Sequence, residues 1–179
     1  MLINEPAALP QSEAITITIA QLEDIPALQA TAAASWWATY GSYLPASFIE
    51  NFLARAYSAD SLAADLTNSS CRFLLAKADN ALIGFGQVGP TMPRRDDAPV
   101  AQADLYRLYL LPQWQGRGIG RRLLIELEEW LREQGYPHCG AYVHEQNTPA
   151  QGFYLHQGFV RQPACDVQGE WYLVKTFDH

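Results

Sequence analysis

The chain has 179 residues and a mass of 20.0 kDa, a size that fits one domain with a single core. Apolar residues make up 49% of the sequence and charged residues only 17%, which excludes a mostly disordered protein. The formal net charge of −7 is opposite in sign to the basic surface that phosphate-backbone binding requires, so nucleic acid is not expected as a partner.

Cysteine usage and the N-terminal residues bear on the cellular compartment. Three cysteines without CxxC spacing favour reduced thiols in a cytoplasmic protein over a disulfide frame or a zinc site, and we expect no bound metal. Residues 1–14 lack the basic start and apolar run of a secretory signal, so we expect a flexible leader before one domain over residues 15–179. Polar residues, a glycine and a proline interrupt the uncharged stretch 25–49, which predicts a buried helical region and no membrane association.

The first third of the chain is predicted to be helical after a single strand. Residues 15–20 begin I-T-I-T-I, a period-two pattern of β-branched residues that is typical of a strand. Asp24 is placed to cap a helix over residues 25–39, with a proline in its first turn. Helical spacing of apolar residues predicts a second helix over 46–57 and a short one over 61–66.

The middle of the chain predicts a hairpin, a loop and a further strand. Two apolar runs, 71–78 and 81–88, are separated by an Asp-Asn pair, which is typical of a tight antiparallel turn. Residues 89–100 contain three prolines and four charged residues, so we expect a surface loop there, long enough to contact a substrate. Residues 104–111 then predict a strand that ends at a proline.

The last third alternates helices and strands. An amphipathic helix is predicted over 118–134, with Gly135 as its stop. A strand over 141–144 and a helix over 148–156 follow, and the strands 159–161 and 171–176 close the chain as a pair. No repeat or linker divides this order of elements, which predicts one mixed α/β domain.

A glycine-rich turn joins the predicted strand 104–111 to the helix that follows. Its members are Gln115, Gly116, Arg117, Gly118, Ile119 and Gly120. Glycines let the backbone present successive N–H groups to an anion at the positive end of the helix dipole, although glycines also occur as simple turn residues. Arg121 and Arg122 open the helix where the dipole favours acidic residues, which favours a polyphosphate ligand.

The spacing of these glycines argues against two common nucleotide-binding motifs. A dinucleotide fingerprint requires G-x-G-x-x-G, whereas the turn reads G-x-G-x-G. A nucleoside-triphosphatase loop requires Gly-Lys followed by Ser or Thr, and the turn has neither. The turn instead resembles the acetyl-CoA motif of the GNAT family of N-acetyltransferases, which Gln115, Gly118 and Gly120 match. Residues 147–159 resemble the family's second signature, an Asn, a Phe-Tyr pair and a Gly-Phe.

The resemblance covers nearly the whole chain and implies the fold and the co-substrate. The implied fold is a mixed central sheet of about six to seven strands, splayed at the acetyl-CoA cleft and flanked by about four to five helices. The pyrophosphate would lie on the glycine turn, and the backbone of Leu108 and Leu110 would pair with the pantetheine arm. The N–H of Leu110 would polarise the thioester carbonyl. Asn147 would contact the cofactor, but it is equally suited to cap the next helix.

The resemblance also assigns catalytic roles. Tyr154 matches the family's general acid, which protonates the CoA thiolate when the tetrahedral intermediate formed by direct amine attack collapses; the alternative is a core tyrosine. The amine must lose its proton to a base, directly or through water. Asp104 is our first candidate for that base and Glu145 the second, while His144 titrates in the right pH range.

The acceptor is expected to be a primary amine. Trp37 and Tyr40, with Trp36 and Tyr43 close by in sequence, either line an amine pocket through cation–π contacts or belong to the core. We count Glu145 on the same acceptor side. This segment resembles the PaiA-like, polyamine-type branch of the family, while protein N-termini and lysines stay open as acceptors.

Two other functions and the oligomeric state stay open at this stage. The chain could be a catalytically silent acyl-CoA sensor or a nucleotide-binding regulator, but it has both the glycine turn and the matching tyrosine, which favours an enzyme. Enzymes of this kind are often dimers, and the closing strands would offer an edge for a homodimer.

Overall fold

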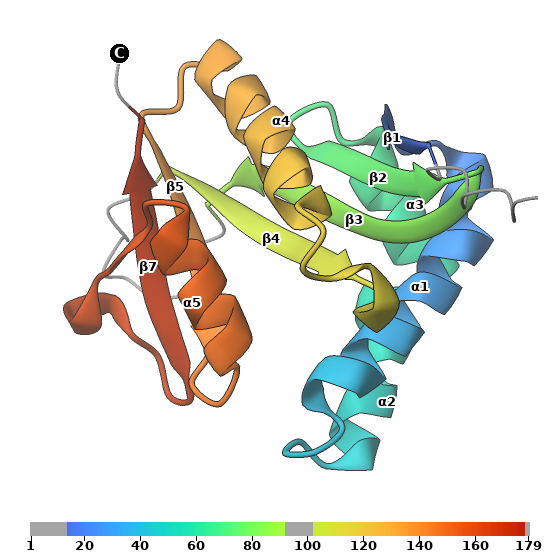
Figure 1. The fold of residues 1–179 in the computed structure, drawn as a ribbon, viewed down its shortest axis with the longest axis horizontal. Coiled ribbons are helices and arrows are strands. Elements are labelled where there is room, and N and C mark those ends of the chain that lie inside the picture. The colour runs from blue at the N-terminus through green and yellow to red at the C-terminus, as the bar shows by residue number, and fades with distance from the viewer. Residues whose placement is uncertain (1–13, 92–101, 178–179) are drawn as a thin grey trace, which may run out of the picture.

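The computed structural model describes residues 14–91 and 102–177 (Figure 1). In chain order the elements are β1 (Ile15–Ile19), the 3₁₀ turn η1 (Leu22–Asp24), α1 (Ile25–Tyr40), α2 (Ala46–Ala56), α3 (Ala59–Thr67), β2 (Arg72–Ala78), β3 (Ala81–Pro90), β4 (Ala103–Leu110), η2 (Pro112–Trp114), α4 (Ile119–Glu133), β5 (His138–His144), α5 (Thr148–His156), β6 (Val160–Arg161), η3 (Pro163–Cys165) and β7 (Glu170–Thr176). The seven strands form one sheet in the order β1-β2-β3-β4-β5-β7-β6. The predicted mixed α/β fold is confirmed.

Helices cover both faces of the sheet, and each face has its own apolar cluster. α1, α2 and α3 pack on one face, while α4 and α5 pack on the other, where Figure 1 shows α4 crossing β3 and β4. In β2, Leu74 and Ala76 face α4, whereas Phe73 and Leu75 face the other layer. A strand buried on both sides has no polar alternation, which explains the continuous apolar run in its sequence.

The predicted hairpin of β2 and β3 is confirmed. Asp79 and Asn80 both have positive φ, +46° and +72°, as the two central residues of a type I′ turn require. The predicted loop over 89–100 is wrong at its start, because Gly89 and Pro90 pair with Asp104 and Ala103 at the end of β3. The rest of that loop falls mostly outside the described residues, as does almost all of the predicted leader over 1–14.

Some local predictions differ from the structure. Asp24 does not cap α1; its carboxylate accepts the N–H of Gln21 (2.9 Å) and pairs with Lys77 (2.9 Å). α3 is longer than predicted because Ser58 caps it, accepting the N–H of Ser61 at 3.1 Å. β5 begins three residues earlier than predicted because β7 pairs along its whole length.

The sheet opens between β4 and β5, the parallel pair at its centre. Within the described chain they pair only at Asp104–Gly140 and Leu105–Ala141. Beyond these residues the two strands diverge, as Figure 1 shows. A bulge at Tyr106 coincides with the start of the divergence, since Gln87 pairs with Arg107 and the next residue of β3 already pairs with Leu105. The splay predicted from the family resemblance is therefore present.

None of the helices within residues 14–91 and 102–177 combines the length and the apolar character that a membrane-spanning helix needs.

Candidate active site

The opening between β4 and β5 holds a cavity of about 60 Å³. Its walls come from β4, β5, the end of α1, and α5 with the residue before it. The lining residues are Tyr40, Leu105, Tyr106, Arg107, Leu108, Tyr109, Tyr142, Val143, Asn147, Ala150 and Tyr154. The cavity therefore brings together predicted site residues from three separate segments: Tyr40, Leu108, and Asn147 with Tyr154.

One wall of the opening is a free strand edge. The N–H of Leu111 donates to the carbonyl of Ile83 in β3 at 2.9 Å. Because backbone groups alternate sides along a strand, the N–H groups of Leu108 and Leu110 face away from β3, toward the side that β5 has left. The side chain of Gln115 donates to the carbonyl of Leu110 at 3.2 Å and so ties the glycine turn to this edge. Such an edge fits an extended chain that carries amides, as pantetheine does.

The glycine turn lies at the end of this edge, at the N-terminus of α4. Gly116 and Gly118 have φ of +73° and +78°, a left-handed conformation that strains other residues, and a Cβ on either would meet no atom within 4 Å. Gly118 is the N-cap of α4 and makes no side-chain cap, so the first N–H groups of the helix are available to an anion. Gly120 has ordinary φ and packs near Leu110 and Phe153. The open cradle fits a pyrophosphate.

Charge and anchoring at the turn support the same fit. Ile119 is buried and anchors the start of α4 in the core. Arg117 stacks on Trp114, with its Cζ 4.7 Å from the ring centre, and Arg122 donates to the carbonyl of Ile15 at 3.4 Å. Arg121 is exposed and pairs with no acidic side chain in the described part of the chain. The helix start therefore carries positive charge that an anion can neutralise.

Tyr154 reaches the cavity from α5. Its side chain is only 8% exposed and packs between the rings of Phe153 and Phe159. Burial raises the pKa of its hydroxyl well above the usual value of 10. Among the described residues the hydroxyl has no hydrogen-bond partner, although it lines the cavity. Tyr154 is thus a neutral donor available to a group in the cavity.

Asn147 has the capping role that was one of its two predicted roles. Its side-chain oxygen accepts the N–H of Ala150 at 3.2 Å at the start of α5. Asn147 also lines the cavity, so the capping residue is itself part of the wall of the opening. Both interpretations are compatible at this position.

Asp104 does not fit the predicted role of general base. It lies where β4 and β5 are still paired, is 6% exposed, and accepts a hydrogen bond from the hydroxyl of Tyr172 at 3.2 Å. Leu110 is six residues further along an extended strand, about 20 Å away. Asp104 does not line the cavity, and a base must come within hydrogen-bond reach of the proton it removes.

The predicted aromatic acceptor residues separate into two groups. Tyr40 lines the cavity, and its ring lies 5.8 Å from that of Tyr43 and 6.4 Å from that of His144. The rings of Tyr43 and His144 are 4.9 Å apart. Trp37 instead is 40% exposed and does not line the cavity. Trp36, one helical turn before Tyr40, packs on the Tyr40 ring at 4.4 Å. Trp37 is rotated by about 100° from Trp36, because each residue turns the helix by that angle.

The side chain of Glu145 is exposed just past the end of β5. Its backbone carbonyl accepts a hydrogen bond from Gln151 at 2.9 Å, and its N–H donates to the carbonyl of Gly169 at 2.9 Å. These bonds hold the backbone of the loop between β5 and α5, next to Asn147. Glu145 therefore stays at the rim of the opening.

Two residues at the opening, Tyr109 and Arg107, were not predicted from the sequence. The hydroxyls of Tyr109 and Tyr40 are 3.2 Å apart, and burial raises the pKa of both. Arg107 pairs with Asp65 at 2.9 Å and donates to the carbonyl of Ala56 at 3.0 Å. The period of two along the strand was the available signal, because it puts Arg107 and Tyr109 on the face opposite Leu108 and Leu110.

No three His, Cys, Asp or Glu side chains within residues 14–91 and 102–177 gather as metal ligands would.

Comparison with known proteins agrees with this geometry. Residues 31–159 match the model of the acetyltransferase (GNAT) family. The spermidine N(1)-acetyltransferase of Thermoplasma acidophilum is 33% identical over 149 residues, covering 81% of this chain and 88% of that protein. The N-acetyltransferase YuaI of Bacillus subtilis is 28% identical over 140 residues, covering 78% of this chain and 77% of that protein.

A solved structure extends the likeness to three dimensions. The PaiA N-acetyltransferase from Thermoplasma acidophilum in complex with coenzyme A superposes with a TM-score of 0.82 at 30% identity, covering 92% of this chain and 99% of that chain. The matched family model spans the glycine turn, the opened strand pair and Tyr154. The chain belongs to the GNAT family of acetyl-CoA-dependent N-acetyltransferases.

Proposed function

We propose that this protein transfers the acetyl group of acetyl-CoA to a primary amine of a small polyamine-type acceptor. The observation that carries the proposal is the opened strand pair: the free edge at Leu108 and Leu110 leads to the cradle at Gly116 and Gly118, with the hydroxyl of Tyr154 in the same cavity.

Main-chain groups would hold most of the co-substrate. The amides of Leu108 and Leu110 would pair with the pantetheine arm, with Asn147 beside it, and the N–H groups at the start of α4 would bind the pyrophosphate. Arg117 and Arg121 would neutralise its charge. When bound, the co-substrate supplies an acetyl group activated as a thioester.

Two donors of the chain would assist direct attack by the amine. The N–H of Leu110 would donate to the carbonyl oxygen as it gains negative charge. The hydroxyl of Tyr154 would give its proton to the departing sulfur, and its raised pKa keeps the phenol protonated at neutral pH until then. The backbone donor and the phenol thus serve the two atoms on which charge develops.

The amine must lose its proton before it attacks. The Nδ1 atom of His144 accepts the N–H of Gln146 at 3.2 Å, so this lone pair is already used and the ring is poorly suited as a base. We assign removal of the proton to water at the open rim, beside the exposed carboxylate of Glu145.

The acceptor side combines aromatic rings with negative charge. Tyr40, Tyr43 and His144 form an aromatic group at the cavity mouth. Burial is the largest cause that raises the pKa of Tyr40, and the negative charge of the Glu170 carboxylate raises it further. Negative charge therefore acts on the cavity mouth. Rings beside a carboxylate favour a substrate with a second, protonated amine. The relative named as a spermidine N(1)-acetyltransferase supports this class.

The test is calorimetric titration with acetyl-CoA, followed in the same preparation by thiol release with spermidine, spermine, aminoglycosides and lysine-containing peptides. We expect binding, and thiol release that depends on spermidine or spermine. Release with peptides alone would overturn the polyamine assignment. Binding without release on any amine would favour the acyl-CoA sensor, and absence of binding would overturn the proposal.

A paired substitution tests the acceptor site. Tyr43→Leu removes a ring of the aromatic group, and we expect it to raise the KM for spermidine about tenfold while CoA binding is unchanged. Phe48→Leu, at a 51% exposed aromatic position on α2, is the matched control and should change neither quantity. Equal KM values for the two variants would exclude Tyr43 from the acceptor site.

A further inference from the structure

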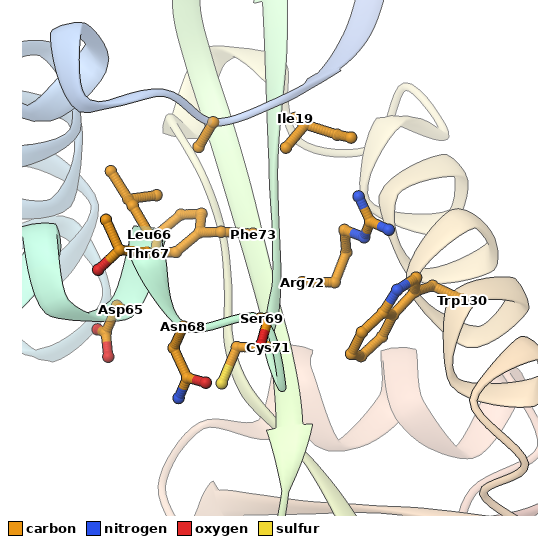
Figure 2. Close-up of a pocket in the computed structure, with 11 residues that line it drawn as sticks. Ile19, Asp65, Leu66, Thr67, Asn68, Ser69, Cys71, Arg72, Phe73 and Trp130 are labelled. Atoms are coloured by element: carbon orange, nitrogen blue, oxygen red, sulfur yellow. The ribbon is translucent and has the colours of Figure 1, made fainter.

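A second cavity, of about 240 Å³, lies at the sheet edge where β1 ends (Figure 2). The N–H of Ala20 donates to the carbonyl of Phe73 at 3.0 Å, and the pairing of β1 with β2 ends at Ile19–Leu74. Cys71 and Arg72 therefore lie beyond the last residues at which β2 pairs with β1. Figure 2 shows Arg72 and Trp130 on one side of β2, and Leu66 and Phe73 on the other.

This edge cavity is separate from the acetyl-CoA opening. Arg72 pairs with Val88, which pairs with Leu105, so the cavity lies level with the end of β4 that is still joined to β5. Its lining shares no residue with the lining of the opening. A ligand here would leave the co-substrate edge free.

The uncompensated charge in the edge cavity is positive. The guanidinium of Arg72 lies over Trp130, 5.3 Å from the ring centre, and it pairs with no carboxylate among the described residues. Asp65 also lines the cavity, but its carboxylate is paired with Arg107 at 2.9 Å. Arg72 is half-buried, and its planar fork of N–H donors is preorganised by the stacked indole.

We propose that the edge cavity binds a small monocarboxylate with an apolar body. The carboxylate would be held by the fork of Arg72, a geometry that suits a bidentate pair. The apolar body would lie against Ile19 and Trp130, which line the cavity on the same side of β2 as Arg72. The volume is below that of most drug-sized pockets, so the ligand is small.

The surroundings favour a carboxylate over a phosphate. A phosphate dianion needs more than one cation, whereas Arg72 is the cavity's one cation without an acidic partner in the described chain, and Asp65 nearby opposes a second negative charge. The planar arginine fork and the indole fit a flat, singly charged head group.

Benzoate is the probe, titrated into the ¹⁵N-labelled full-length protein. The indole N–H signal of Trp130, identified with Trp130→Phe, should shift saturably with benzoate and not with benzamide, which has the same shape without the charge. Benzamide shifts equal to those of benzoate, the absence of saturation, or tighter binding of inorganic phosphate would overturn the proposal. The titration contains no acetyl-CoA and no amine, so its outcome is independent of the proposed acetyl transfer.

Variants localise the carboxylate. Arg72→Gln should raise the apparent Kd for benzoate at least about tenfold, as loss of a charge-assisted bond predicts. Arg72→Lys keeps the positive charge but loses the planar fork, so it should also weaken benzoate binding. This variant replaces Arg72→Gln in the test if Arg72→Gln does not fold. Arg55→Gln, at an exposed arginine of α2, should bind as the unmodified chain does. Unchanged affinity in both Arg72 variants would exclude the site.

Discussion

Three tyrosines at the opening differ in how their hydroxyls are used. The hydroxyls of Tyr40 and Tyr109 lie 3.2 Å apart and are bonded to each other. The hydroxyl of Tyr154 has no such partner among the described residues, yet it is on the cavity wall. A proton donor must be able to give its hydrogen to the substrate, so the absence of an internal partner is what qualifies Tyr154.

Tyr154→Phe should keep CoA binding and lower the rate of thiol release by about 10²–10⁴-fold, the range typical of general acid–base catalysis. The phenol is buried and contributes little to co-substrate affinity, so calorimetry should give the same Kd as the unmodified chain. Tyr136→Phe, a tyrosine away from the opening, is the matched control. An unchanged rate in Tyr154→Phe would remove this residue from the mechanism.

At the scale of elements, α4 joins the site to the core. Its N-terminus forms the cradle, and its residue Glu128 is buried. The Nζ of Lys175, in β7 beyond the opening, donates to both carboxylate oxygens of Glu128 at 2.7 Å each. Arg132 adds a longer contact of 3.4 Å to the same carboxylate. Because β4 and β5 pair at only two positions, such cross-links stabilise the two halves of the sheet against each other.

Two glycines that flank α4 with the same left-handed backbone conformation allow the effect of a substitution on stability to be separated from its effect on CoA binding. Gly118 and Gly135 have φ of +78° and +81° at opposite ends of α4, with open space around both. A glutamate at either position should cost about 1–2 kcal/mol of unfolding free energy through left-handed strain. Only Gly118→Glu should abolish CoA binding, because it brings bulk and negative charge to the cradle. Calorimetric binding by Gly118→Glu that equals that of Gly135→Glu would reject the cradle.

The buried carboxylate of Glu128 makes the cross-link sensitive to loss of one partner. Lys175→Met should lower the unfolding free energy by about 2 kcal/mol, less than the 3–5 kcal/mol of a wholly buried pair because Arg132 remains. Lys175→Met combined with Glu128→Leu should recover part of that loss, since no charge stays buried. Urea unfolding of the single and double variants tests this, and additive losses would contradict it.

Across the whole molecule, buried tyrosines occur on both faces of the sheet. Tyr57 is 3% exposed in the layer of α1, α2 and α3, and burial is the main cause that raises its pKa to about 12. Burial also raises the pKa of Tyr154 in the opposite layer and of Tyr172 in β7. The folded state therefore keeps these phenols protonated where the unfolded chain would ionise them.

This difference predicts loss of stability at alkaline pH. Each raised pKa contributes stability that is complete below pH 10, the unfolded value, and is lost as the pH rises toward the folded value. For Tyr57, a rise from 10 to about 12 corresponds to roughly 3 kcal/mol. The unfolding free energy, measured in urea between pH 8 and 12, should fall above pH 10, and Tyr57→Phe should reduce the fall. The same slope in both proteins would contradict the assignment.

Local chemistry made much of the fold and part of the site predictable. The Asp-Asn turn, the glycine turn and the stop at Gly135 depend on the conformational preferences of neighbouring residues, and the positive φ values at Asp79, Asn80 and Gly118 agree with those preferences. The GNAT resemblance, through Gln115 to Gly120 and Tyr154, led to the family that the comparisons confirm.

Tertiary structure alone decided which polar and aromatic residues meet. The bulge at Tyr106 shifts the register of β4, and the strands open only after Leu105, so Asp104 is on the closed side although it belongs to the same strand as Leu110. These outcomes depend on pairing between segments far apart in sequence, whose register no local pattern encodes. The sequence by itself therefore determined the family and the glycine turn at the N-terminus of α4, whereas packing decided which side chains line the opening.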